Sequence, residues 1–208
     1  MFTYHKINTV FKRDEKTKKI ILKSWSQPEF EFLANNTWEW TEKIDGTNCR
    51  VFWNHETKTI QFGGRTENAQ IPAALIARLQ EIFTVEKLVL LYPDVSVMFF
   101  GEGYGAKIQA IGSYYKSDGV DFILFDVVIG RWWLQREAVN KIAVNLDIQS
   151  VPIVGEGSLG NAIDYVQDNN NSNFGKFTME GIVLRPAVEL FARNGSRIIA
   201  KLKHKDFL

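Results

Sequence analysis

The sequence predicts an α+β fold in which antiparallel sheets are flanked by helices. Short apolar, β-branched and aromatic runs dominate the chain, and residues 55–58 form a turn that would join two of them as a hairpin. Two or three segments with helical spacing interrupt these runs. No strand–helix–strand unit with a glycine-rich phosphate loop is visible. Residues 101–103 read Gly-Glu-Gly, but the residues that follow do not match a dinucleotide-binding fingerprint.

Each predicted element rests on its local pattern. The expected strands are residues 37–43, 49–53, 59–62, 95–101, 122–128, 181–184 and 197–203. A first helix is expected over residues 71–83, where apolar residues recur at helical spacing and Pro72 suits the first turn. A second is expected over residues 134–146, and a third is capped by Ser158 and runs to about Gln167. The polar stretch 168–173 resembles a linker between a helix and a strand.

Length and composition restrict the class of protein. The chain has 208 residues, of which 45% are apolar and 24% charged, which excludes a disordered or collagen-like chain and fits one domain over residues 1–208. No run of 18 apolar residues and no signal-peptide core occurs, so no membrane association is expected. The single Cys49 excludes an internal disulfide and, with only three histidines, argues against a structural zinc site. These features predict a cytoplasmic protein, in the host cytoplasm if it is viral.

The charge is unevenly placed although the net charge is only +1. Residues 1–23 hold seven Lys/Arg against two acids, and residues 193–208 hold five against one. Basic surfaces at both ends are compatible with a polyanionic partner. The alternative is an ordinary solvated surface.

The segment Glu42-Lys-Ile-Asp-Gly-Thr-Asn48 ends a predicted strand with a lysine and continues into a glycine-containing turn. The turn would expose the ammonium group of Lys43, and Gly46 would allow close approach of a ligand. A lysine must lose its proton before it can act as a nucleophile, and neighbouring cations favour that loss. The alternative interpretation is a surface lysine beside a β-turn.

Further charged residues lie at the ends of predicted strands. Lys201 and Lys203 alternate on one strand and therefore face the same side, as phosphate ligands or as guards of an exposed edge strand. Glu102 and Glu180 adjoin glycines at strand ends, where a carboxylate can meet a ribose hydroxyl or a hydrated metal. Phe122 offers an aromatic face to a base, although its apolar strand favours core packing.

Taken in order, these segments resemble the motifs of one enzyme superfamily. They are Lys-x-Asp-Gly-x-Asn, an Arg 22 residues after the lysine (Arg65), Phe-Gly-Glu-Gly, Asp-Phe-x-x-Phe-Asp, Glu-Gly-Ile-Val-Leu-Arg and Lys-x-Lys. The chain is similar to the covalent nucleotidyltransferases, which include ATP-dependent ligases and mRNA-capping enzymes and use a fold with ATP-grasp-like character. Within them it most resembles the RNA ligases, especially the phage double-strand-sealing and trypanosome RNA-editing group. Asn48 favours that branch, because DNA ligases and capping enzymes usually carry Arg there.

The resemblance implies an activity and a set of site residues. Lys43 would attack the α-phosphate of ATP to form lysyl-AMP, and the AMP would pass to an RNA 5′-phosphate that a 3′-hydroxyl then attacks. Lys201 and Lys203 would neutralise the α-phosphate. Glu42 would contact adenine through its main chain, and Phe122 would stack on the ring. Glu102 would bind the ribose, and Asn48 and Arg65 would contact the phosphate or ribose region and the donor end. Asp45, Glu102 and Glu180 would hold the water shell of Mg²⁺, for which Mn²⁺ can substitute.

Two departures from the family pattern stand out. Ligases of this group commonly continue about a hundred residues beyond Lys-x-Lys into a second domain, whereas here the sequence ends at Leu208. We therefore expect a nucleotidyltransferase domain without a C-terminal accessory domain, either a minimal one-domain ligase or a shortened form of a longer one. We expect it to act as a monomer on RNA ends such as nicked duplexes in RNA repair. Some relatives have histidine where this chain has Asp45. The alternatives are a DNA ligase or capping-type enzyme of the same superfamily, and an inert module that binds nucleic-acid ends.

Overall fold

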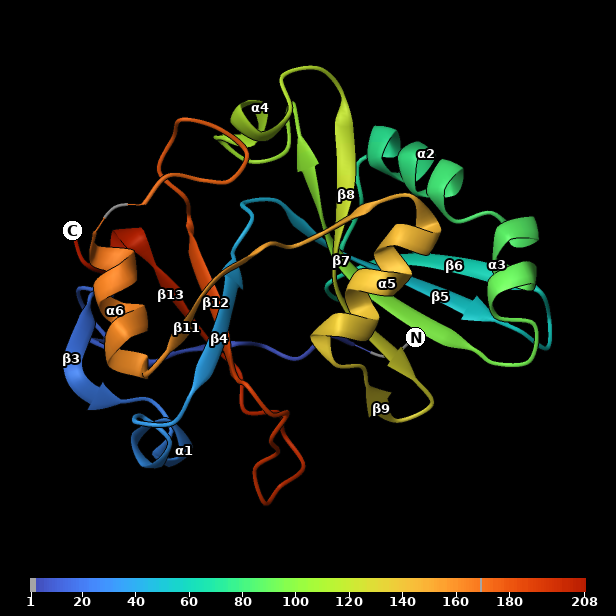
Figure 1. Cartoon of the computed structure of the whole chain (residues 1–208). Helices are drawn as coiled ribbons and strands as arrows, with labels where there is room; N and C mark the ends of the chain where they lie inside the picture. The colour runs from blue at the N-terminus through green and yellow to red at the C-terminus, as the bar shows by residue number, and fades with distance from the viewer. Residues whose placement is uncertain (1–2, 169) are drawn as a thin grey trace. The chain divides into compact units, whose positions relative to one another are not determined.

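The computed structural model describes residues 3–168 and 170–208, and the chain forms two compact units (Figure 1). Unit 1 comprises Met1–His5 and Asp45–Val151, and unit 2 comprises Lys6–Ile44 and Pro152–Leu208. Each unit combines a sheet with helices, so the predicted α+β class is confirmed. The expectation of one functional domain over residues 1–208 stays a prediction.

Unit 1 is built on a sheet with the strand order β10-β8-β7-β5-β6, with β9 paired to β8. Strands β5 to β8 pair antiparallel, whereas β10 runs parallel to β8. The strands are β5 (Thr47–Asn54), β6 (Thr59–Gly64), β7 (Val97–Gly105), β8 (Val120–Ile129), β9 (Trp132–Trp133) and β10 (Gln149–Ser150). The helices are α2 (Ala73–Ile82), α3 (Val85–Leu91), α4 (Gly112–Tyr115) and α5 (Arg136–Leu146).

The core of unit 1 lies between its sheet and helices α2, α3 and α5. Leu75 and Leu79 of α2, Leu88 of α3 and Val139 of α5 are buried against apolar strand residues. In α2 and α5 the buried residues recur at helical spacing, so one face of each of these two helices is covered and the other meets solvent. This core fixes β5 and β7, whose ends carry several of the predicted site residues.

Unit 2 is built on a sheet with the strand order β1-β13-β12-β4-β11 and a separate two-stranded β2–β3 sheet. Strand β4 pairs antiparallel with both β11 and β12, whereas β1 runs parallel to β13. The strands are β1 (Asn8–Thr9), β2 (Phe11–Arg13), β3 (Ile20–Trp25), β4 (Trp38–Glu42), β11 (Ile153–Gly157), β12 (Gly181–Pro186) and β13 (Ala200–Lys203). The helices are α1 (Pro28–Phe32), α6 (Leu159–Gln167) and the short 3₁₀ helix η1 (His204–Asp206).

The core of unit 2 packs α1 and α6 against its strands. Trp38 and Trp40 of β4 are buried with Ile182 of β12 and Leu159 of α6. Ser158 caps α6 as the sequence predicts, because its side chain accepts a hydrogen bond from the backbone N–H of Asn161 in a capping box. The cap fixes the start of α6 beside β11.

All seven predicted strands and three predicted helices occur, with ends shifted by a few residues. The largest shift is in β7, which was expected to end at residue 101 and ends at residue 105. Pro72 is the N-cap of α2 and precedes its first turn. Segments without a strong period, such as β1 to β3 and α3, were not predicted. None of the helices in the described part of the chain has the length and apolar character needed to cross a membrane.

Candidate active site

The side chain of Lys43 lies at the end of β4, where the backbone pairing with β12 continues one residue further. The backbone N–H of Lys43 donates a hydrogen bond to the carbonyl oxygen of Gly181 at 2.9 Å. Gly181 has a φ of +155° and passes so close to β13 that an added Cβ would meet the carbonyl oxygen of Leu202. Glycine is therefore required at this crossing. The close passage brings Glu180, the preceding residue, beside Lys43.

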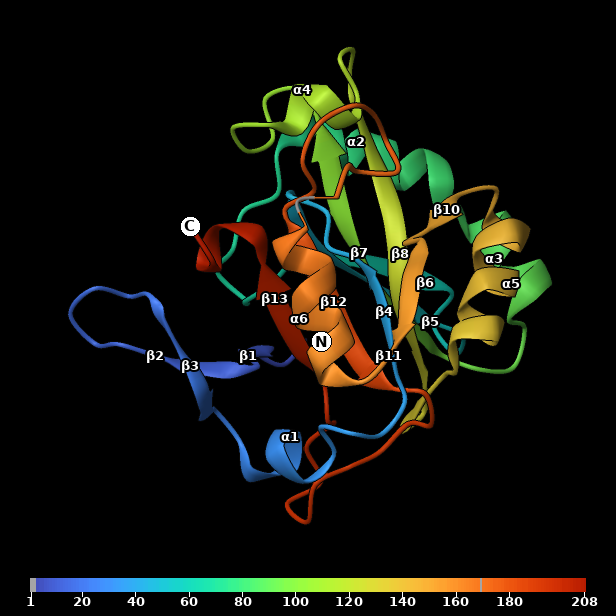
Figure 2. The ribbon, with the colours of Figure 1, turned by 60° about the vertical axis from the view of Figure 1, so that its left-hand side comes forward.

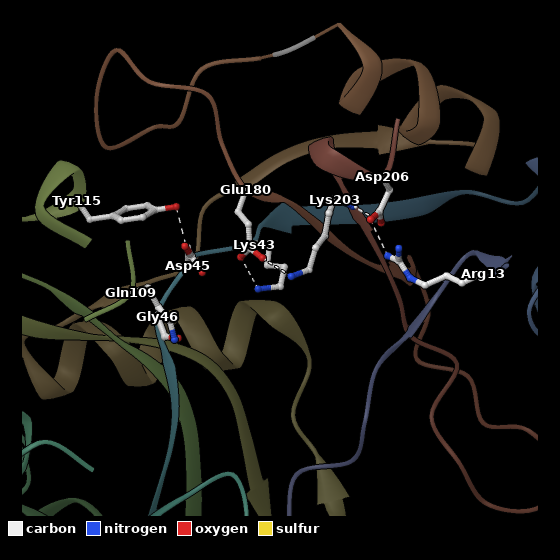
Figure 3. Close-up of polar contacts among 9 residues, drawn as sticks. All are labelled: Arg13, Lys43, Asp45, Gly46, Gln109, Tyr115, Glu180, Lys203 and Asp206. Carbon is white, nitrogen blue, oxygen red and sulfur yellow. Dashed lines mark hydrogen bonds and ion pairs between the residues drawn. The ribbon is translucent and has the colours of Figure 1, made fainter. Parts of the chain in front are cut away.

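Glu180 binds two lysines at once, as Figure 3 shows. Its Oε2 atom lies 2.5 Å from the Nζ atom of Lys43, and its Oε1 atom lies 2.5 Å from the Nζ atom of Lys203. The Lys43 and Lys203 side chains are about one-fifth exposed, so the three groups form a cluster open to solvent with an excess positive charge. Such a cluster can bind an anion. The predicted grouping of these three residues is thus present within unit 2.

Lys201 is a second lysine on β13, the strand that carries Lys203. It lies opposite Val183 of β12, whereas Lys203 lies opposite Gly181. Because side chains alternate along a strand, Lys201 and Lys203 share one face of β13. Both are partly exposed, while Leu202 between them is buried in the core. Lys201 and Lys203 therefore lie on the same, partly exposed face of β13, as the sequence predicts.

Glu42 precedes Lys43 on β4 and is buried, with 1% of its surface exposed. Its carboxylate accepts hydrogen bonds from Ser172 Oγ at 2.5 Å, from the backbone N–H of Asn173 at 2.9 Å and from Asn173 Nδ2 at 3.1 Å. These hydrogen bonds anchor the loop 170–179, which leads into Glu180. Burial, and secondarily the negative charge of Glu42, raises the pKa of Tyr165. A main-chain contact from Glu42 to adenine stays a prediction.

The turn that follows Lys43 belongs to unit 1 and is held by hydrogen bonds inside that unit (Figure 3). The backbone N–H of Asp45 donates to Tyr115 Oη at 3.3 Å, and the carbonyl oxygen of Gly46 accepts from Gln109 Nε2 at 3.0 Å. An added Cβ at Gly46 would meet the carbonyl oxygen of Gly103. The glycine is therefore needed for close packing of this turn on β7, as the sequence suggests.

Asn48 and Glu102 are brought together by strand register. They lie directly opposite each other on the antiparallel strands β5 and β7, so their side chains project from the same face of the sheet. The Oδ1 atom of Asn48 is buried and has no hydrogen-bond partner among the described residues. A buried polar oxygen without a partner is uncommon and marks a position where a ligand can donate a hydrogen bond.

Arg65 and Phe122 have different surroundings in unit 1. Arg65 is exposed directly after β6. Phe122 is 1% exposed and packs edge-on against Phe83, with ring centroids 5.7 Å apart, in the core under Gly101. This is the packing role that its apolar strand favours. Stacking of Phe122 on a base stays a prediction.

The predicted metal ligands are divided between the units. Glu180 lies in unit 2, whereas Asp45 and Glu102 lie in unit 1. Within the described ranges, no group of three or more His, Cys, Asp or Glu side chains is close enough to hold a metal ion. The donor set consists of carboxylates, which is the ligand type that Mg²⁺ prefers. The assignment of these three residues to a metal stays a prediction.

Four residues that contact this site were not singled out from the sequence. Ser172 and Asn173 bind Glu42, and Tyr115 and Gln109 bind the turn after Lys43. Ser172 and Asn173 belong to the stretch that was interpreted as a linker. Its richness in Asn and Ser was the available signal, because these side chains bind nearby polar groups as readily as they favour loops.

Comparisons with known proteins agree with the motif set. A family model described as RNA ligase matches residues 36–203. The structure of Naegleria gruberi RNA ligase with PPi is similar to this chain with a TM-score of 0.67 at 20% identity, covering 99% of this chain and 63% of that one. A mutant of the same ligase with AMP and Mn has a TM-score of 0.67 at 21% identity, covering 86% and 53%. A further mutant with ATP and Mn has a TM-score of 0.65 at 22% identity, covering 86% and 54%.

These likenesses show a shared fold. The chain spans 53 to 63% of the length of these three ligase structures. No curated protein matches it.

Proposed function

The chain belongs to the RNA ligase family, and from this premise we propose that it joins RNA ends in an ATP-dependent reaction through a lysyl-AMP intermediate on Lys43. The observation that carries the proposal is the contact of Glu180 with both Lys43 and Lys203. It places a candidate nucleophile beside a second cation and a carboxylate, which is the local chemistry that nucleotidyl transfer needs.

In the first step the Nζ atom of Lys43 attacks the α-phosphorus of ATP. A nitrogen–phosphorus bond forms, the bond to the β-phosphate oxygen breaks, and pyrophosphate leaves with that electron pair. The amine must give up its proton, for which Glu180 Oε2 at 2.5 Å is the acceptor within reach. Lys201 and Lys203 oppose the negative charge that develops on the phosphoryl oxygens.

In the later steps the AMP passes from Lys43 to a 5′-phosphate end, which regenerates the amine. A 3′-hydroxyl then attacks the activated 5′-phosphate, forms the phosphodiester bond and expels AMP. RNA ends, including those of nicked duplexes, are the proposed substrates. Asp45, Glu102 and Glu180 would hold the water shell of Mg²⁺ or Mn²⁺, and the ion would supply further charge neutralisation at the phosphates.

The remaining candidate residues are proposed as nucleotide contacts. Asn48, with its partnerless Oδ1 atom, would accept a hydrogen bond from the nucleotide. Glu102, opposite Asn48 on β7, would bind the ribose hydroxyls. Glu42 would contribute its main chain to adenine recognition, Phe122 its ring, and the exposed Arg65 a charge for the nucleotide or the RNA end.

The test is covalent labelling with α-labelled ATP and Mg²⁺, followed by denaturing electrophoresis. We expect label on the wild type, none on Lys43→Ala, and undiminished label on Lys141→Ala, which removes a lysine that is 73% exposed and distant from β4 in sequence. The label should survive mild alkali and be lost in acid, as expected of a phosphoramidate. Label that persists on Lys43→Ala would falsify the lysyl-AMP assignment.

Substrate choice separates the proposal from other members of the superfamily. We expect sealing of nicked duplexes with an RNA 3′-hydroxyl strand and labelling by ATP in preference to GTP. Sealing confined to all-DNA nicks would instead identify a DNA ligase. Labelling by GTP alone would identify a capping-type enzyme.

A further inference from the structure

The β2–β3 hairpin, residues 11–25, carries a strong local positive charge. It holds six Lys/Arg against two acids, a net charge of +4. The whole chain holds 25 Lys/Arg against 24 acids, so the other residues hold 19 against 22 and a net charge of −3. The hairpin is therefore a basic element on a chain that is otherwise acidic.

The hairpin presents its lysines to solvent while its opposite side joins the core. Phe11 and Trp25 contact each other with ring centroids 5.0 Å apart and pack with the core of unit 2. The side chains left exposed include Lys12, Lys16, Lys18, Lys19 and Lys23. Figure 2 shows the hairpin, in blue, projecting away from β12 and β13 of unit 2. Four of these lysines, Lys12, Lys16, Lys18 and Lys23, form no ion pair within residues 3–168 and 170–208.

Two of the lysines occupy backbone conformations that favour glycine or asparagine. Lys18 has a φ of +60° and Lys23 a φ of +63°. A side chain with a Cβ in this left-handed region costs roughly 1 kcal/mol. Local backbone preference therefore does not explain lysine at these positions, and strained residues of this kind cluster at functional sites.

The turn end of β2, where Arg13 pairs with Ile20, is connected to the strand that carries Lys201 and Lys203. Arg13 Nη2 donates to Asp206 Oδ1 at 2.6 Å, and Asp206 Oδ2 accepts from the backbone N–H of Lys203 at 3.3 Å (Figure 3). The Asp206 side chain is 1% exposed and the Arg13 side chain 33% exposed, so this connection is partly buried. A polyanion bound to the hairpin is thereby held in a defined position relative to the Lys43–Glu180–Lys203 cluster.

We propose that the β2–β3 hairpin is a docking element for the phosphodiester backbone of the RNA substrate. The proposal rests on the proposed function for its choice of polyanion, and on charge complementarity for its choice of surface. The lysines contact phosphates without reading bases, so binding is independent of sequence and strongly dependent on salt. Ile21 and Leu22 are also exposed on the hairpin, and a protein partner that covered them would be the competing occupant.

The test measures RNA affinity as a function of salt. A fluorescent nicked RNA duplex is titrated with protein at 50 to 200 mM NaCl without ATP or Mg²⁺, so that no chemistry occurs. The hairpin variant is Lys16→Gln/Lys23→Asn, in which asparagine tolerates the positive φ of residue 23. The matched control is Lys141→Gln/Lys58→Asn, because Lys58 is likewise exposed with a φ of +52°.

We expect the hairpin variant to lose about two units of the slope of log affinity against log salt, roughly 0.9 for each phosphate contact. The ratio of wild-type to variant affinity should then be about tenfold larger at 50 mM than at 200 mM NaCl. The control should keep the wild-type slope. An unchanged slope in the hairpin variant, absence of RNA binding by the wild type, or a loss of affinity that is equal at every salt concentration would overturn the proposal.

Lysyl-AMP formation separates this proposal from the proposed function, because that step needs no RNA. The hairpin variant should form the labelled adenylate as fast as the wild type. Normal labelling with an unchanged salt slope refutes the docking element alone. Absent labelling in the wild type with the expected change of slope refutes the ligase reaction and leaves the hairpin as a polyanion-binding element.

Discussion

Replacement of Glu42 tests whether the buried carboxylate anchors the loop 170–179. Glu42→Ala removes an acceptor that takes three hydrogen bonds and leaves the proton of the buried Ser172 hydroxyl without its acceptor. Hydrogen bonds to charged groups contribute about 1.5 to 3 kcal/mol each. The Asn173 side chain is exposed and can turn to water, so part of the loss is recovered. We expect the free energy of unfolding to fall by about 3 kcal/mol. Most of this loss arises because the hydrogen-bond donors that faced the buried carboxylate stay behind without an acceptor.

Glu42→Gln should cost clearly less than Glu42→Ala. The glutamine oxygen can still accept from both donors of Asn173, and its amide can donate to Ser172 Oγ. For a chain of this length, 1 kcal/mol lowers the melting temperature by about 2 to 4 °C. The alanine variant should therefore melt about 6 to 12 °C below the wild type in a thermal unfolding experiment, and the glutamine variant less than half as far.

The control for this experiment is Glu31→Ala, an exposed glutamate of α1 in the same unit. It should melt within about 2 °C of the wild type. Because the loop leads into Glu180, the alanine variant should also be cleaved faster by protease within residues 170–179 and should form lysyl-AMP more slowly. A Glu42→Ala protein that melts like the wild type, or a glutamine variant as unstable as alanine, would refute the anchoring role.

Three further predictions concern single residues. Gly46→Ala should destabilise the chain by about 1 to 3 kcal/mol in chemical denaturation, because its Cβ would meet Gly103, whereas Gly160→Ala should be harmless since its methyl group makes only ordinary contact. Cys49 should resist alkylation at about pH 8 until denaturant is added, because burial raises its pKa to about 12; fast labelling of folded protein would contradict this. Burial raises the pKa of Glu39, so the folded state binds its proton more tightly and stability falls as pH rises through that pKa. Glu39→Gln should therefore raise the melting temperature more at about pH 7 than at about pH 4, and an equal effect at both would refute the assignment.

Local patterns in the sequence predicted the elements whose residues alternate or recur with a clear period. Strand β4, helix α5 and the capped start of α6 at Ser158 are examples, because each depends on neighbours within one or two turns or on a two-residue alternation. The basic N-terminal segment was also visible, since charge can be counted without a structure. Strands β1 and β2 were missed because they span only two and three residues, and β3 because its six residues lack an apolar alternation.

The ordered motifs identified the family and the candidate nucleophile from the sequence alone. The tertiary structure decided which side chains meet, because register between distant strands is not written in any local pattern. Glu180 contacts Lys43 across 137 positions of the chain, and Ser172 contacts Glu42 across 130. The pairing of β4 with β12 brings Glu180 to Lys43. The buried carboxylate of Glu42 needs hydrogen-bond donors, and Ser172 supplies one of them. The tertiary structure also placed Phe122 in the core of unit 1, whereas its residue type alone was compatible with either core packing or stacking on a base.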